Sequence, residues 1–239
     1  MNSHHLKFFL PILLTIACSI TPSFIYTDVM PSTEEPIVDV DPEATQTSLS
    51  PTPTIQPSVE TSPAQEIITL PISLYILDDE AGQFSSARTV EDLEAVYEKV
   101  NQIWAQAGIV LEIQTIERVS VPPLYLQTIV VRDFQRFFEG IGTDIELSEP
   151  GLLNGFYAQT IGGPNGIAPF GSRVFFVTDQ PTVYSERVSS HEVGHLLGLH
   201  HVLDDPNRLM FSGTNGMQLS EAEIAVARYT AQGLLDGVR

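Results

Sequence analysis

Residues 191–201, HEVGHLLGLHH, are the most informative part of this sequence. His191 and His195 are four positions apart, so on a helix both imidazoles project from one face, close enough to coordinate one tetrahedral metal ion. Gly198 has no Cβ, so it can adopt a positive φ, end the helix and turn the chain sharply. That turn would bring His201 back as a third ligand. The stretch therefore predicts a helix with two metal ligands and a turn that supplies the third.

The number of predicted ligands indicates the type of site. Three protein ligands leave the fourth tetrahedral position open, which is typical of a catalytic zinc site rather than a structural one. Glu192 points about 100° round the helix from His191. Its carboxylate can reach a water molecule at the metal without coordinating the metal, which is the position that a general base needs. We therefore predict one catalytic Zn²⁺ bound by His191, His195 and His201, with Glu192 as the catalytic residue.

The placement of the histidines favours this assignment. Two of the six, His4 and His5, lie close to the N-terminus, and the other four lie within residues 191–201. His200 is the local alternative to His201 as third ligand, although it lies one residue early for the predicted turn. Without a metal, the stretch would be an amphipathic helix with solvated histidines. We expect His201 to be the ligand, and His200 to face solvent or to support a ligand.

The extended spacing H-E-x-x-H-x-x-G-x-x-H resembles that of the metzincin clan of zinc endopeptidases. In this clan the third histidine is followed by a tight turn with a methionine beneath the metal. Met210 follows His201 by nine residues and resembles this Met-turn residue, at a spacing similar to that of matrixin-like members. The chain has Ser212 where some members have a tyrosine ligand, and Val202 where matrixins usually have serine. The resemblance is therefore to the clan and not to one family within it.

The metzincin resemblance implies a fold class and an activity. The implied fold is α+β and zincin-like. It has a twisted, mixed N-terminal sheet with a long helix and the active-site helix, then a small C-terminal part with the Met-turn and a last helix. The implied activity is that of a zinc metalloendopeptidase, which hydrolyses peptide bonds by metal-activated water with Glu192 as general base. The implied partner is a peptide or protein substrate, and we expect a monomer.

Hydrophobic periodicity in the first half of the domain agrees with this order of elements. Apolar alternation predicts a strand over 67–77, and apolar spacings of three and four predict a helix over 90–107. Gly108 should end that helix. A second strand is predicted from 109 to 116, and a third around 126–131. Strand, long helix and strand is the order with which metzincins begin.

The second half of the domain is predicted to frame a cleft. Residues 151–171 are rich in glycine and predict a loop near the cleft, followed by a strand over 174–177. By the resemblance, this strand edges the cleft, and residues 168–173 contact the substrate backbone. The alternative is a plain edge of the sheet with no contact to substrate. Ser220 and Glu223 have the spacing of a capping box and predict the start of the last helix.

Two other interpretations are open at this point. In a gluzincin-type peptidase a downstream helical glutamate, here Glu221 or Glu223, would be the third ligand. That assignment would leave the pair of Gly198 and His201 without a purpose. Alternatively, the chain is a catalytically silent, zinc-containing binding protein of the cell surface.

Residues 1–66 are expected to lie outside the folded domain. Residues 1–18 contain a short apolar run typical of a signal peptide, and the run that ends at Cys18 resembles a bacterial lipobox. Residues 19–66 are rich in proline, threonine, serine and acidic residues, a composition that predicts a disordered linker. Residues 67–239 then form the catalytic domain. We expect an exported protein, either a cell-surface lipoprotein anchored through Cys18 or a secreted protein.

The charge of the chain excludes some classes of partner. With a formal net charge of -19, the protein is a poor partner for nucleic acid and for anionic lipid surfaces. Contact with a membrane is therefore expected only through a lipid on Cys18. Because Cys18 is the only cysteine in the sequence, no internal disulfide can form.

Overall fold

The computed structural model describes residues 66–141, 147, 149 and 151–238. The predicted leader with Cys18 and the predicted linker up to residue 65 lie outside these residues. Among the described helices, none has both the length and the apolar character needed to cross a bilayer.

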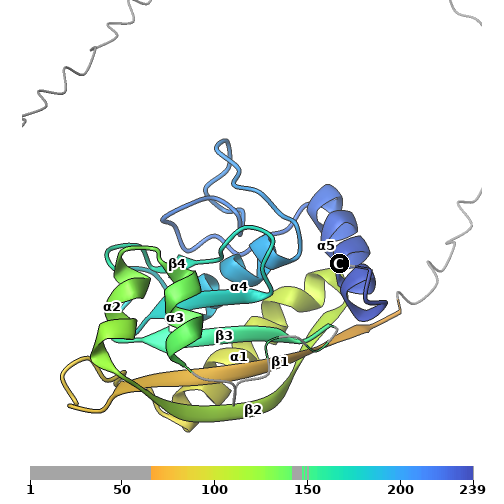
Figure 1. The fold of residues 1–239 in the computed structure, drawn as a ribbon. Helices are drawn as coiled ribbons and strands as arrows, with labels where there is room; N and C mark the ends of the chain where they lie inside the picture. Colours follow the sequence, from red (N-terminus) through yellow and green to blue (C-terminus); the bar gives the residue numbers. More distant parts are fainter. Residues whose placement is uncertain (1–65, 142–146, 148, 150, 239) are drawn as a thin grey trace, which may run out of the picture. The chain divides into compact units, whose positions relative to one another are not determined.

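A five-stranded sheet forms the centre of the domain (Figure 1). The order of its strands is β2-β1-β3-β5-β4, and all neighbouring pairs are parallel except β4 with β5. The strands are β1 (Ile68–Asp79), β2 (Ile109–Val121), β3 (Leu153–Ala158), β4 (Gly166–Ile167) and β5 (Val174–Thr178). Parallel sheets are stable in proteins when helices cover both of their faces.

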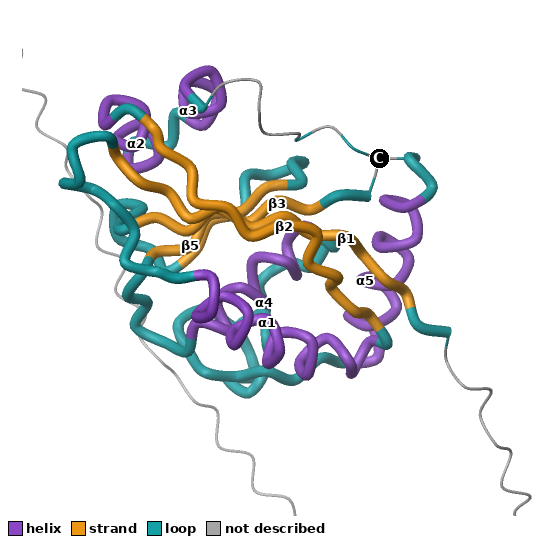
Figure 2. Tube along the Cα trace, turned by 90° about the horizontal axis from the view of Figure 1, so that it is seen from below, coloured by secondary structure: helices purple, strands orange, loops and turns teal. Residues whose placement is uncertain are grey.

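Helices do cover both faces of this sheet, as Figure 2 shows. One face carries α1 (Val90–Trp104), α4 (Ser185–Leu196) and α5 (Glu221–Leu235), and the other carries α2 (Pro123–Val130) and α3 (Phe134–Gly140). The helix with the first two histidines, α4, therefore lies on the same face as the long helix α1. The predicted α+β fold class is confirmed.

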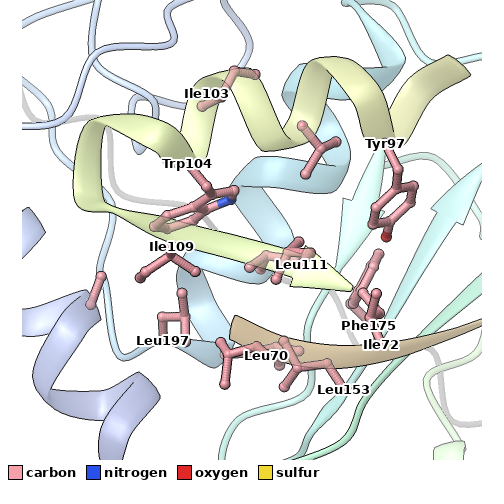
Figure 3. Close-up of a cluster of buried hydrophobic side chains, with 14 of the residues drawn as sticks. Leu70, Ile72, Tyr97, Ile103, Trp104, Ile109, Leu111, Leu153, Phe175 and Leu197 are labelled. Carbon is pink, nitrogen blue, oxygen red and sulfur yellow. The ribbon is translucent and has the colours of Figure 1, made fainter. Parts of the chain in front are cut away.

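The larger hydrophobic core lies between the sheet and the three helices α1, α4 and α5 (Figure 3). Trp104 of α1, Leu70 of β1 and Leu197, which follows α4, are all completely buried in it. Burial of a large apolar side chain contributes about 1.5–3 kcal/mol to stability. Helix α1, the sheet and the end of α4 share this core. The helix that carries the first two histidines is therefore packed firmly against the rest of the domain.

Local sequence signals account for the ends of these elements. A capping box begins α1, and the predicted capping box of Ser220 and Glu223 begins α5. The helix predicted over 90–107 continues from α1 into a short 3₁₀ turn, Ala105–Ala107. Gly108 then adopts a φ of 60° and ends it, as predicted.

The strand predicted around 126–131 is wrong, because this segment belongs mainly to helix α2. A short run of apolar and β-branched residues suits either a strand or a buried helix. Pro122 and Pro123 favour the helix, since a proline at the first helical position loses no hydrogen bond and has a suitable φ. Leu126 and Ile129, three positions apart, are then buried on one side of α2.

The prediction of one loop over 151–171 is also wrong in part. Its first half contains β3, whose residues are all buried in the middle of the sheet. Gly155 made this strand hard to predict, because a glycine inside a strand weakens its sequence pattern. In the structure this glycine leaves room for Phe175 of β5, whose Cζ would lie 2.6 Å from a Cβ at position 155. The predicted strand over 174–177 is β5, but it lies inside the sheet. The edge strand next to β5 is β4 instead, and β2 forms the opposite edge.

Candidate metal centre

The helix that carries the first two histidines ends as predicted. Helix α4 stops at Leu196, and Gly198 has a φ of 82°. The N–H groups of Gly198 and Leu199 donate to carbonyl groups of the last helical turn, at 3.1 and 2.9 Å, in the pattern of a Schellman motif. The chain therefore turns sharply directly after α4.

Three imidazoles meet where the chain returns to the helix. Nε2 of His201 lies 3.1 Å from Nε2 of His191 and 3.1 Å from Nε2 of His195. All the candidate ligand atoms lie within 4.8 Å of one another, and no other group of three such side chains occurs in the part of the chain that the structure describes. His200 is exposed and outside this cluster. The structure thus brings together the three predicted histidines and leaves His200 out.

The hydrogen bonds of the rings indicate that the cluster fits a metal ion. Nδ1 of His191 lies 2.8 Å from Leu209 O, and Nδ1 of His195 lies 3.0 Å from Leu199 O. A carbonyl oxygen only accepts, so in the neutral rings both Nδ1 atoms carry the proton and both Nε2 atoms present a lone pair. Nε2 of His201 can donate a proton to only one of these. Tetrahedral zinc ligands at 2.0–2.1 Å from the metal are about 3.3 Å apart, close to the observed separations of 3.1 Å.

Burial keeps the imidazoles of His191 and His195 in the neutral form that a metal requires. Removal from water lowers the pKa of His191 to about 3, although the hydrogen bond to Leu209 acts in the opposite direction. Burial also lowers the pKa of His195. Both rings are therefore neutral at neutral pH, with Nε2 free to coordinate.

The predicted methionine lies in a turn beneath α4. Residues 208–211, here called the Met-turn, are closed by a hydrogen bond between the first and last residues. Met210 is fully buried, and a Cβ at Gly194 would lie 2.6 Å from its Sδ. Because Gly194 is next to His195, the thioether packs directly against the backbone that carries the histidines. Met210 therefore lies against α4 at the residue next to His195.

Glu192 is buried against the edge of the sheet. It is 5% exposed, and a Cβ at Gly166 of β4 would lie 2.4 Å from its Oε1. Burial raises the pKa of Glu192 to about 8, and the positive charge of Arg187 acts in the opposite direction. The carboxyl group therefore titrates close to neutral pH, where it can both accept and release a proton.

Arg187 is a buried residue of this site that the motif did not predict. It is 3% exposed, and its Nη2 donates to the carbonyl oxygens of Leu209, at 3.0 Å, and of Phe211. Burial lowers the pKa of Arg187, and the charge of Glu192 opposes that change. Its position four residues before His191, on the same face of the helix, is the signal in the sequence that could have revealed it.

The carboxylates of the gluzincin alternative are not placed as metal ligands. Glu223 pairs with Arg208 of the Met-turn, and it accepts from the N–H of Ser220, at 2.9 Å, in the capping box of α5. Neither Glu221 nor Glu223 belongs to the histidine cluster. The geometry gives this alternative no support.

Two hollows open beside the histidines. One, of about 390 Å³, is lined by the three histidines together with Gly166, Glu192 and Ser212. The other, of about 340 Å³, lies between residues 168–172 and the turn at Gly198. The second half of the predicted loop, with β4, therefore borders the cleft as expected.

Comparison with known proteins gives only distant similarities. No protein-family model and no curated protein matches the sequence. Among solved structures, the chain is similar to a chaperone-substrate complex (TM-score 0.45, 15% identity), over 71% of this chain and 36% of that chain. It is similar to metalloproteinase-II from Bacteroides fragilis (TM-score 0.43, 14% identity), over 70% of this chain and 55% of the other.

A third similar structure is the archaemetzincin from Methanopyrus kandleri, with a TM-score of 0.39 and 16% identity over 74% of this chain and 98% of that chain. The chain spans only 36% and 55% of the length of the first two structures. Similarities this low do not assign the chain to a family.

Proposed function

We propose that this chain is a zinc-dependent endopeptidase of the metzincin type. The observation that carries the proposal is the meeting of three imidazoles, two of them held with a lone pair on Nε2, beside a buried carboxyl group. His191, His195 and His201 would hold the ion and leave one tetrahedral position open. Zinc bound there supplies Lewis acidity, which polarises a carbonyl group and lowers the pKa of water toward about 7.

Glu192 would carry the proton during hydrolysis. Its carboxylate removes a proton from the attacking water as the bond between oxygen and carbon forms. It then gives that proton to the amine nitrogen as the bond between carbon and nitrogen breaks. Burial raises the pKa of this group to about 8 in the metal-free protein, and the charge of bound zinc would lower it from there toward neutral pH. Gly166, which has no side chain, leaves room for the carboxyl group beside β4.

The free edge of the sheet favours a peptide as the substrate. Strand β4 pairs with β5 on one side only, so its other side offers backbone N–H and C=O groups close to Glu192. An extended peptide would add there as a further strand, with side chains in the two hollows. Residues 168–173 would contact its backbone beyond β4.

The location of the enzyme is a proposal that rests on residues 1–66. The short apolar run and the proline-rich linker favour export, followed by anchoring through a lipid on Cys18 or by secretion. The acidic charge disfavours nucleic acid as a partner. We propose that the enzyme acts as a monomer on peptides or proteins outside the cell.

The proposal is tested by comparing the wild type with Glu192→Gln on a peptide library. The wild type should cleave peptides, lose this activity in a chelator and regain it with zinc. The variant should still bind one zinc ion but should lose at least about 100-fold in activity, because an amide cannot accept the proton. A wild type that binds zinc but cleaves nothing would favour the catalytically silent binding protein.

A further inference from the structure

Arg187 occupies an unfavourable position for a charged residue. It lies on α4, one helical turn before His191, and is almost completely buried. Transfer of a charged group from water is costly unless its hydrogen-bond donors find partners. Within the described residues Arg187 forms no ion pair with a carboxylate, and its Nε has no partner. If the residue only filled space, an apolar side chain would serve stability as well or better.

The donors of Arg187 are used on the Met-turn. Its Nη2 donates to Leu209 O, at 3.0 Å, and to Phe211 O. These two carbonyl groups flank Met210, whose side chain packs beneath α4. A single nitrogen atom thus holds both sides of the turn against the helix that carries the first two histidines.

The carbonyl group of Leu209 connects Arg187 to a metal ligand. The same oxygen accepts the Nδ1–H of His191 at 2.8 Å. A carbonyl oxygen has two lone pairs, so Arg187 and His191 together saturate it. The position of this oxygen sets the tautomer and the orientation of the His191 ring. The guanidinium group of Arg187 therefore shares one acceptor with a predicted metal ligand.

The Met-turn also reaches the third histidine. The N–H of Val202, which follows His201, donates to Met210 O at 3.1 Å, and Val202 pairs with Phe211 in an isolated β-bridge. Because Arg187 holds the carbonyl group of Phe211, loss of the guanidinium group would loosen the support of the third histidine as well as the first.

We propose that Arg187 is a positioning residue of the metal site, which holds the Met-turn where His191 and His201 can share one ion. This inference rests on the proposed zinc site and concerns the affinity for the metal. The hydrogen bonds of Arg187 should strengthen zinc binding, because they hold the ligands in place. Its positive charge should weaken zinc binding, because a buried cation near the site repels Zn²⁺. The two effects can therefore be separated by the sign of the change in affinity.

The test is the zinc dissociation constant of Arg187→Met, measured by competition with a chromophoric chelator in the absence of substrate. Loss of the two hydrogen bonds should weaken zinc binding about 10 to 100-fold. The visible absorption of the Co²⁺-loaded protein, which reports the geometry of the ligands, should change as well.

Arg88→Met is the matched control. Nη2 of Arg88 also makes two hydrogen bonds, to Asp179 O at 2.7 Å and to Ser185 Oγ at 2.8 Å, and its Nε is likewise buried without a partner. These bonds tie a loop to the first residue of α4 and do not involve the Met-turn. The control should bind zinc like the wild type, with an unchanged Co²⁺ spectrum, even if its stability falls.

The outcomes separate the possible roles of Arg187. Unchanged zinc affinity in Arg187→Met would overturn the proposal in favour of a purely structural role, and tighter binding would overturn it in favour of an effect of charge alone. If this variant does not fold, Arg187→Lys decides, because it keeps the charge but has a shorter reach and no planar fork. Weaker zinc binding in that variant supports the proposal, and wild-type binding overturns it. A wild type that binds no zinc would overturn the proposed function as well.

Discussion

Burial of Glu192 suits its proposed catalytic role but reduces the stability of the folded protein when the carboxyl group is ionised. Its carboxyl group is almost completely buried, and a buried carboxylate is unfavourable. Its pKa is about 8 in the folded protein, against an ordinary value of 4.5. Between these values the folded protein binds more protons than the unfolded chain. The contribution of this group to stability is therefore fully present below pH 4.5 and is lost as the pH rises through 8.

We expect Glu192→Gln to stabilise the metal-free protein at alkaline pH. The amide does not ionise, so the variant should gain relative to the wild type as the pH rises, by on the order of 3–5 kcal/mol at pH 9. Urea unfolding of both proteins in a chelator, between pH 4 and pH 9, measures this difference. Parallel stability curves over that range would contradict the burial of the carboxyl group.

The neighbouring residues His200 and His201 should differ sharply in their effect on zinc. His201→Ala removes one of the three clustered Nε2 atoms and should weaken zinc binding by several orders of magnitude. His200→Ala removes an exposed ring and should change affinity by less than about tenfold. The measurement is the zinc content after dialysis against a weak chelator. The reverse order of effects would move the third ligand to His200.

At the scale of elements, the site depends on how closely the edge strand β4 approaches helix α4. A Cβ at Gly166 would lie 2.4 Å from Oε1 of Glu192 and 2.6 Å from its Cγ. Such a contact cannot be tolerated unless an atom moves. The end of a glutamate side chain moves more easily than the backbone of either element, so the carboxyl group would give way first.

Gly166→Ala should therefore impair catalysis more than folding. Displacement of a catalytic group by about 1 Å can reduce the rate about 100-fold, so we expect a comparable loss in kcat while zinc remains bound. Gly233→Ala is the control, because a Cβ at Gly233 of α5 would meet nothing within 4 Å. That variant should be fully active and slightly more stable, by about 1 kcal/mol. Full activity of Gly166→Ala would contradict the close contact with Glu192.

At the scale of the whole molecule, the metal site is assembled from segments that are distant in sequence. Helix α4 supplies two histidines, the turn at Gly198 returns the third, the Met-turn supports them from below, and β4 confines the carboxyl group. The shared core beneath α1 and α4 holds these parts in register.

The proposed anchor is tested by Cys18→Ala in the full chain. If Cys18 carries a lipid, the substitution should move the protein out of the membrane fraction or block its processing, because the hydrophobic anchor is lost. Partitioning into a detergent phase measures this change. Unchanged partitioning of the variant would count against lipidation and favour a protein with a cleaved leader.

Some features were predictable because they depend on residues that are close in sequence. Capping boxes, the end of a helix at Gly198 and the common face of His191 and His195 all follow from local backbone geometry. The strand β3 and the helix α2 were not predictable in the same way. Their apolar runs suit more than one element, and the choice depends on neighbours such as Phe175, which packs on Gly155 from the adjacent strand.

The sequence by itself determined which three histidines come together, because four-residue spacing on a helix and a glycine turn are local properties. Only the tertiary structure decided the state of the groups around them. The raised pKa of Glu192 depends on its burial, beside Gly166. The role proposed for Arg187 depends on its hydrogen bonds to the carbonyl groups of Leu209 and Phe211. These contacts join residues more than twenty positions apart. Removal of a side chain from water and its hydrogen bonds to a distant backbone depend on tertiary packing, so a local sequence pattern cannot predict them.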